Sequence, residues 1–193
     1  MNDRIGRIGS PVCVKPLLSK KAAGIAFART LELVRHICRT NASPLEGLHI
    51  ETVTGIAVGL ARRLKANVEI ARWGALLHDI GSIKFNDRTS GHAITGEPEA
   101  RKIMEDLGFA AHFIDAVCYC VRYHGPESSP VTLEGKIVRA SDSMEALLNF
   151  FELSFAFCSF KALGANGVDI RKGLIEGHRW SGEKRANAES KMG

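Results

Sequence analysis

A histidine and an aspartate, His78 and Asp79, interrupt a strongly apolar helix end that runs from Ala75 to Gly81. No cap or turn requirement explains the histidine. A carboxylate in such apolar surroundings is costly unless a cation compensates it, and imidazole together with carboxylate suits Zn, Fe, Mn, Co or Ni. The pair therefore predicts a metal site at the core of whatever the chain folds into.

Helix signals dominate the chain from about residue 24 onward, and no internal repeat interrupts them. Proline and glycine residues separate helices that we expect over 24–39, 44–65, 68–79, 110–124 and 132–149, with Gly81 as the stop of the third. A further helix between Gly91 and Gly108 has an open start because of Pro98. These signals predict an all-α fold.

The 193 residues suffice for one core, so we expect one main domain over 23–163, with its motif-bearing part at 43–148. The formal net charge of +5 gathers at the ends, in an N-terminal extension over 1–22 and in a polar, basic C-terminal tail over 164–193. Nucleic-acid binding requires a basic stripe on a folded face, so the charge pattern does not indicate a polynucleotide partner.

The five cysteines form no C-x-x-C pair, which argues against a secreted disulfide framework. The sequence starts with charged residues rather than a secretory signal, and its apolar runs are shorter than the ~20 residues that cross a bilayer. We therefore expect a cytoplasmic protein without a membrane span.

Three further polar residues lie on apolar helix faces. His49 lies one turn from both Leu45 and Val53, His124 follows Val121 by three residues, and Asp142 follows Val138 by four. Taken singly, each is more often a hydrogen-bonded core residue than a metal ligand. The complete set of inward-facing candidates comprises four imidazoles and two carboxylates: His49, His78, Asp79, His92, His124 and Asp142.

Two first-row metals can share this set of ligands. If Asp79 bridges, one metal takes His49, His78 and Asp142, and the other takes His92 and His124, which leaves positions for water and substrate.

The order His49, His78-Asp79, Asp142, within the segments ALLHDIG, GHAITGEPEARKIMEDLG, RYHG and GKIVRASDSMEAL, resembles the H…HD…D signature of the HD-domain superfamily of metal-dependent phosphohydrolases. His92 and His124 resemble the extra ligands of its binuclear branch. Ser82 follows HDIG where HD-GYP phosphodiesterases have a lysine, and the chain contains no GYP, which argues against a cyclic-dinucleotide phosphodiesterase of that type.

The resemblance implies an HD-domain helical bundle that holds one or two divalent transition metals: Fe, Mn, Zn, Co or Ni. It implies hydrolysis of a nucleotide or small phosphoester by a metal-bound hydroxide, with Asp79 as the bridging and catalytic carboxylate. The cations nearest in sequence to the ligands, which we expect to bind the substrate phosphate, are Lys84, Arg122 and Arg139.

Two other functions fit the same ligands. The set also resembles the ligands of the mixed-valence diiron oxygenases of this superfamily. The other alternative is a non-catalytic HD module that binds a nucleotide or metal and transmits a signal. The Phe-rich segment 150–160 suits a homodimer seam in any of these cases, or completes the core of the domain itself.

Overall fold

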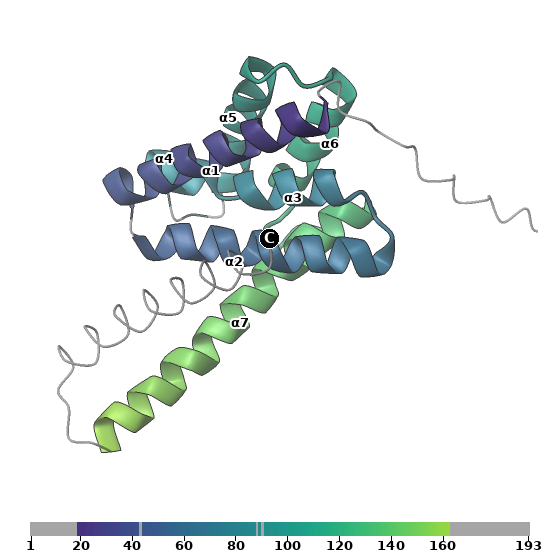
Figure 1. The fold of residues 1–193 in the computed structure, drawn as a ribbon. Coiled ribbons are helices and arrows are strands. Elements are labelled where there is room, and N and C mark those ends of the chain that lie inside the picture. The colour runs from purple at the N-terminus through teal and green to yellow at the C-terminus, as the bar shows by residue number, and fades with distance from the viewer. Residues whose placement is uncertain (1–18, 43, 88, 90, 163–193) are drawn as a thin grey trace, which may run out of the picture. The chain divides into compact units, whose positions relative to one another are not determined.

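The computed structural model describes residues 19–42, 44–87, 89 and 91–162. This part of the chain contains seven helices and no strand, which confirms the all-α class (Figure 1). The helices are α1 (Lys20–Asn41), α2 (Pro44–Leu64), α3 (Val68–Leu77), α4 (Ile80–Phe85), α5 (His92–Asp106), α6 (Ala111–Arg122) and α7 (Leu133–Ala162). None of these helices combines the length and the apolar character that crossing a membrane requires.

The chain divides into two compact units, residues 1–145 and 146–193, and α7 crosses the boundary between them. The first unit holds all the candidate metal ligands. The expected tail over 164–193 and nearly all of the N-terminal extension lie outside the described residues, as do the side chains of the Phe-rich segment.

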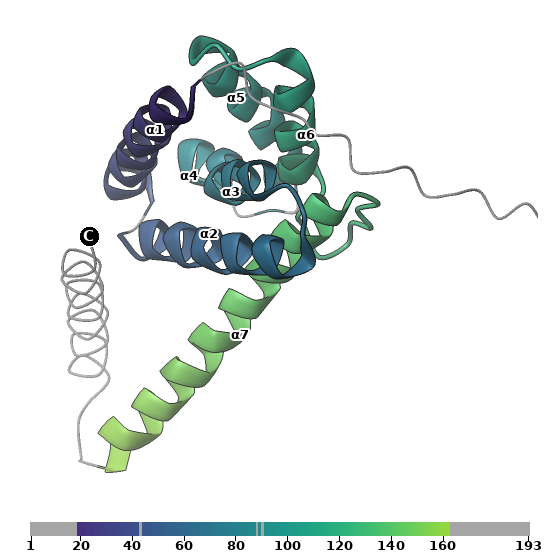
Figure 2. The same ribbon diagram turned by 45° about the vertical axis from the view of Figure 1, so that its right-hand side comes forward.

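Helix α3 is the central element of the first unit, in contact with both α2 and α6 (Figure 2). Seven of its ten residues are buried, among them Ile70, Trp73 and Leu77. Asn67 caps its start by accepting hydrogen bonds from the backbone N–H groups of the next turn. A Cβ at Gly74 would lie 2.7 Å from Cys120 Cβ, so the glycine lets α6 approach closely. This packing fixes the end of α3, where His78 lies.

The expected helix over 68–79 is present as α3, but its expected stop at Gly81 is wrong. The helix ends at Leu77, the backbone leaves helical geometry at Asp79, and Gly81 lies inside the short helix α4. The physical reason is the burial of Ile80 and Ile83 in the core. Because these two side chains are buried, the chain continues into α4 after Asp79 instead of leaving the core at Gly81. The last helix is also longer than the expected 132–149.

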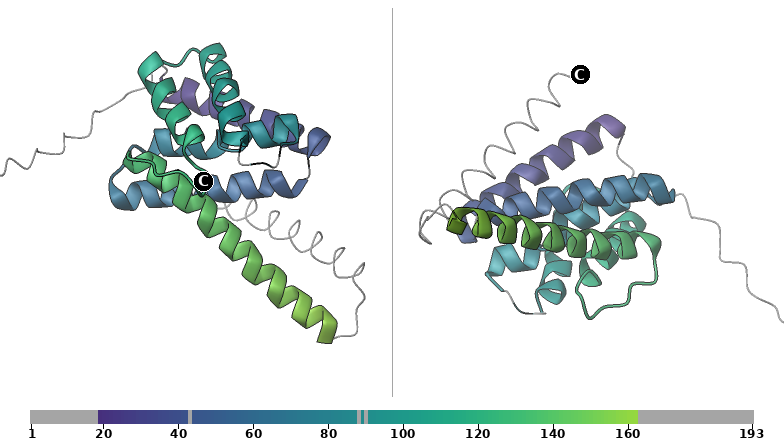
Figure 3. Two further views of the ribbon diagram at one scale, coloured as in Figure 1. Left: turned by 180° about the vertical axis from the view of Figure 1, so that it is seen from behind. Right: turned by 90° about the horizontal axis from the view of Figure 1, so that it is seen from below.

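Gly81 serves packing rather than helix termination. A Cβ at this position would collide with the backbone carbonyl oxygen of His92 and would lie 2.7 Å from the backbone nitrogen of Gly96. Helix α4 therefore touches the start of α5 directly, and this contact places His92 near Asp79. Helix α5 in turn contacts α6, which Figure 3 shows from behind.

We predict that Gly81→Ala destabilises the protein by about 2 kcal/mol or more, because backbone atoms of α5 cannot yield as side chains do. Thermal unfolding should show a melting temperature lower by roughly 4–8 °C. Gly59→Ala is the matched control, since a Cβ there meets nothing within 4 Å on an exposed helix face. Equal melting temperatures for the two variants would contradict the prediction.

Candidate metal centre

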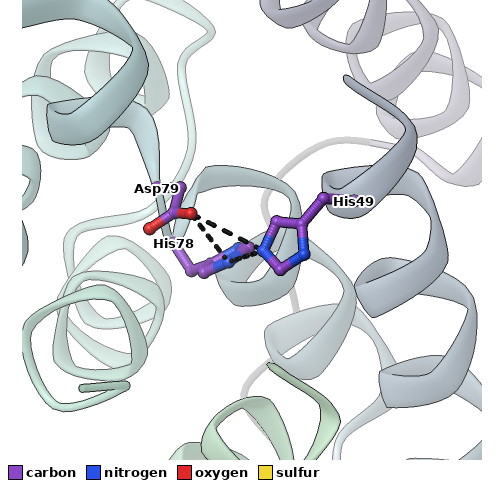
Figure 4. A group of neighbouring side chains, drawn as sticks. All are labelled: His49, His78 and Asp79. Atoms are coloured by element: carbon purple, nitrogen blue, oxygen red, sulfur yellow. Dashed lines mark hydrogen bonds and ion pairs between the residues drawn. The ribbon is translucent and has the colours of Figure 1, made fainter. Parts of the chain in front are cut away.

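The first group of candidate ligands lies where α2 meets the end of α3. His49 Nε2 lies 3.2 Å from His78 Nε2, and Asp79 Oδ2 lies 3.6 Å from the former and 3.5 Å from the latter (Figure 4). Helix α7 adds Asp142, whose Oδ1 is 3.4 Å from His49 Nε2 and 3.8 Å from His78 Nε2. Two imidazole nitrogens and two carboxylate oxygens thus converge on one point.

The second group lies on the other side of the same aspartate. Asp79 Oδ1 is 3.2 Å from His92 Nε2 and 3.4 Å from His124 Nε2, and these two nitrogens are 2.9 Å apart. The two oxygens of Asp79 therefore face two separate histidine pairs, as a carboxylate that bridges two cations would.

Backbone carbonyls orient three of the four imidazoles. The Nδ1 atoms of His78, His92 and His124 lie 2.6–2.7 Å from the carbonyl oxygens of residues three positions earlier, namely Ala75, Thr89 and Val121. A carbonyl oxygen only accepts, so each Nδ1 donates its proton. In the neutral imidazole the Nε2 lone pair is then left for a cation, and the ring plane is fixed in advance.

The charges of the site favour a bound cation. Burial opposes the ionised form of Asp79, but His78 and hydrogen bonds from the other three histidines hold its pKa well below the usual value. Burial lowers the pKa of His49, yet its bonds to Asp79 and Glu145 outweigh that effect and raise the pKa to about 10. The hydrogen bond to Asp79 raises the pKa of His92 to about 9. Positive charge is stabilised here, whether a proton or a metal supplies it.

The donor set fits divalent transition metals. Within each of the two groups, His49–His78–Asp79 and Asp79–His92–His124, the ligand atoms lie within 4.8 Å of one another. Imidazole nitrogen and carboxylate oxygen are the donors that Zn, Fe, Mn, Co and Ni accept, and the tautomers are correct for binding through Nε2. All six candidates from the sequence thus meet at one place.

The three expected phosphate-binding cations have other partners in this structure. Lys84 Nζ lies 2.5 Å from Glu99 Oε2, and an Arg122 nitrogen lies 3.8 Å from Glu97 Oε2. Arg139 donates a 2.7 Å hydrogen bond to the carbonyl oxygen of Pro126 and is the one of these three without a carboxylate partner among the described residues.

Glu145 is not among the residues predicted from the sequence. Its buried carboxylate lies 2.5 Å from His49 Nδ1. It therefore orients this imidazole by a hydrogen bond at Nδ1, as the backbone carbonyls orient the other three. A signal was present, because Glu145 follows Asp142 by three residues and therefore lies one helical turn along the same face of α7.

A family model described as "HD domain" matches residues 47–147. Ribonuclease Y of Treponema denticola is 37% identical over 98 residues, which are 51% of this chain and 18% of that protein. Ribonuclease Y of Petrotoga mobilis is 35% identical over 98 residues. The chain thus spans less than a fifth of the length of these relatives.

Solved structures share the fold. A predicted HD superfamily hydrolase from an uncultured Thermotogales bacterium matches with a TM-score of 0.57 at 23% identity, over 86% of this chain and 92% of that one. Bacillus subtilis YpgQ in complex with ADP matches with a TM-score of 0.52 at 20% identity, over 88% of this chain and 96% of that one.

We predict that Glu145→Gln weakens metal binding at the His49 position by about 10-fold or more, which is typical for loss of a carboxylate behind a ligating histidine. Competition with a chromogenic chelator measures the affinity of each site. Because Glu145 touches His49, the site formed by His92 and His124 should change much less. The exposed Glu105, changed to Gln, is the control, and equal affinities in the wild-type, Glu145→Gln and Glu105→Gln proteins would rule out this role.

Proposed function

The chain belongs to the HD-domain family, and on that basis we propose that it is a metal-dependent hydrolase of phosphoric ester or phosphoanhydride bonds in a nucleotide or other small phosphoester. The observation that carries the proposal is the position of Asp79 between two histidine pairs. Divalent metals bound there would supply Lewis acidity toward phosphoryl oxygens and lower the pKa of a water molecule.

The residues of the chain would divide the work as follows. His49, His78 and Asp142 would hold one metal, His92 and His124 the other, and Asp79 would bridge the two positions. Asp79 would also orient the attacking water by accepting a hydrogen bond from it. Because the imidazoles are held through Nδ1, little reorganisation of the protein accompanies the reaction.

Water has restricted access to the floor of the site. The side chains of His78 and His124 are 0% and 2% exposed, whereas that of Asp142 is 27% exposed. Asp142 is thus the most exposed of the six candidate ligands, and we expect a substrate phosphate to approach from its side. Exclusion of water from the floor strengthens every charge interaction within the site.

Cleavage of RNA is a second candidate function. Its support is the 35–37% identity to proteins named Ribonuclease Y over 98 residues. A phosphodiester of RNA needs the same metal-assisted attack by water, so the ligand set serves both substrates. We place the small substrate first because the charge pattern of the chain does not indicate a polynucleotide partner. The rates at which the chain hydrolyses nucleotides and short RNA distinguish the two functions.

We predict that the anaerobically purified chain contains close to two metals and releases phosphate or a nucleotide from phosphoester substrates at the same rate under N₂ and in air. Asp79→Ala should lower this rate by about a thousandfold, because several kcal/mol of charge stabilisation depend on the bridged metals. Metal analysis and turnover of nucleotides, a generic phosphodiester and short RNA on one sample test this.

Asp106→Ala, at the exposed end of α5, is the control and should retain activity. Two irons with O₂ uptake and no hydrolysis would support the diiron oxygenase instead. Loss of metal in Asp79→Ala without loss of any biological output would support the non-catalytic module.

A further inference from the structure

The imidazole of His92 is held differently from those of His78 and His124. The carbonyl oxygens that accept from Nδ1 of His78 and His124 belong to residues inside α3 and α6. The corresponding acceptor for His92 is the carbonyl oxygen of Thr89, which lies in the segment between α4 and α5. A carbonyl within a helix is fixed by the helix itself, whereas a carbonyl in a connecting segment needs other contacts to fix it.

The His92 ring is also less enclosed by its surroundings. The side chains of His78 and His124 are buried, so packing holds these rings in addition to their hydrogen bonds. The side chain of His92 is 19% exposed. That of His49 is exposed to a similar extent, but the buried carboxylate of Glu145 holds it at Nδ1. The direction of the His92 ring therefore depends strongly on the position of its acceptor carbonyl.

A carboxylate two residues earlier in the chain holds Thr89. The backbone N–H and the hydroxyl of Thr89 both donate to Asp87 Oδ1, at 2.8 Å and 2.6 Å. The Thr89 hydroxyl oxygen in turn accepts a 3.2 Å hydrogen bond from the backbone N–H of Gly91. Hydrogen bonds from a carboxylate to the backbone two residues on set the path of a turn. Asp87 thus fixes the residue whose carbonyl oxygen orients His92.

Asp87 is itself anchored to the core. Its backbone N–H donates a 3.2 Å hydrogen bond to the carbonyl oxygen of Ser82, a buried residue of α4. Asn86, with φ of +51°, ends α4 in the left-handed conformation and turns the chain toward this bond. A series of hydrogen bonds therefore leads from the buried helix α4 to the second histidine pair.

We propose that Asp87 is a positioning residue for the metal position formed by His92 and His124. It holds Thr89 so that the Nε2 atom of His92 faces Asp79. Asp87 belongs to neither ligand group, so it acts on a metal only through Thr89 and His92. The inference rests on the proposed function for the presence of a metal at this position. The role requires a hydrogen-bond acceptor rather than a negative charge, because both bonds end on one oxygen.

The test is a Mn²⁺ titration of the full chain, with free Mn²⁺ measured by electron paramagnetic resonance. Asp87→Ala should weaken the binding of one of the two equivalents by about tenfold, the lower end of the loss typical for an outer partner of a ligating histidine. The affinity for the other equivalent should not change. Asp87→Asn should restore the wild-type affinities, because the amide oxygen of asparagine accepts the same two hydrogen bonds.

A double variant shows whether the effect passes through His92. In His92→Ala, which should retain one equivalent, the addition of Asp87→Ala should cause no further loss of affinity. Asp106→Ala removes an exposed carboxylate from the other end of α5 and is the matched control. Unchanged affinities in Asp87→Ala, an equal loss in Asp106→Ala, a failure of Asp87→Asn to restore binding, or a further loss in the double variant would each overturn the proposal.

A measurement without metal separates failure of this inference from failure of the proposed function. In the EDTA-treated, ¹⁵N-labelled chain the Nδ1–H proton of His92 should give an exchange-protected NMR signal, which the His92→Ala spectrum identifies. Asp87→Ala should broaden this signal and Asp87→Asn should retain it. The expected result in a chain that hydrolyses no phosphoester would contradict the proposed function and support the inference. An equally sharp signal in Asp87→Ala would reject the inference whatever the hydrolysis result.

Discussion

The candidate metal centre is organised around one partly buried carboxylate, that of Asp79. Asp79 lies among four imidazole groups that come from α2, the end of α3, the start of α5 and the segment after α6. Such a group is stable only if positive charge balances it, and here the histidines and the cations that they can hold provide the balance. The end of α3, the start of α5 and the segment after α6 place three of these imidazoles, whereas α2 presents His49 from within the helix.

Several local features produce this placement. The break between α3 and α4 falls at Asp79 itself, and the glycine at position 81 lets α5 approach closely enough to bring His92 in. Hydrogen bonds from Nδ1 to Ala75, Thr89, Val121 and Glu145 then set the direction of each ring. Secondary structure, packing and ligand orientation are thus parts of one arrangement.

The convergence of the six candidate side chains could be predicted from the sequence because a histidine or aspartate on an apolar helix face is conspicuous. Glu145 was not predicted as part of the site because a glutamate on a helix is ordinarily solvated. Only the position of His49, 96 residues away in the sequence, makes Glu145 a buried hydrogen-bond partner. Helix α4 was not predicted because a glycine such as Gly81 is typical both of a helix stop and of a close contact between helices. Only the position of α5 shows that Gly81 makes a close contact. The pairing of Lys84 with Glu99 is likewise a tertiary contact that local patterns do not encode.

Electron paramagnetic resonance of the Mn²⁺-titrated chain decides whether Asp79 would bridge two bound metals. If it does, the chain binds two equivalents of Mn²⁺ and gives an exchange-coupled signal, whereas His92→Ala binds one equivalent and gives an isolated six-line spectrum. A six-line spectrum from the fully loaded wild-type protein would contradict this bridging role, because two manganese ions on one carboxylate cannot be magnetically independent.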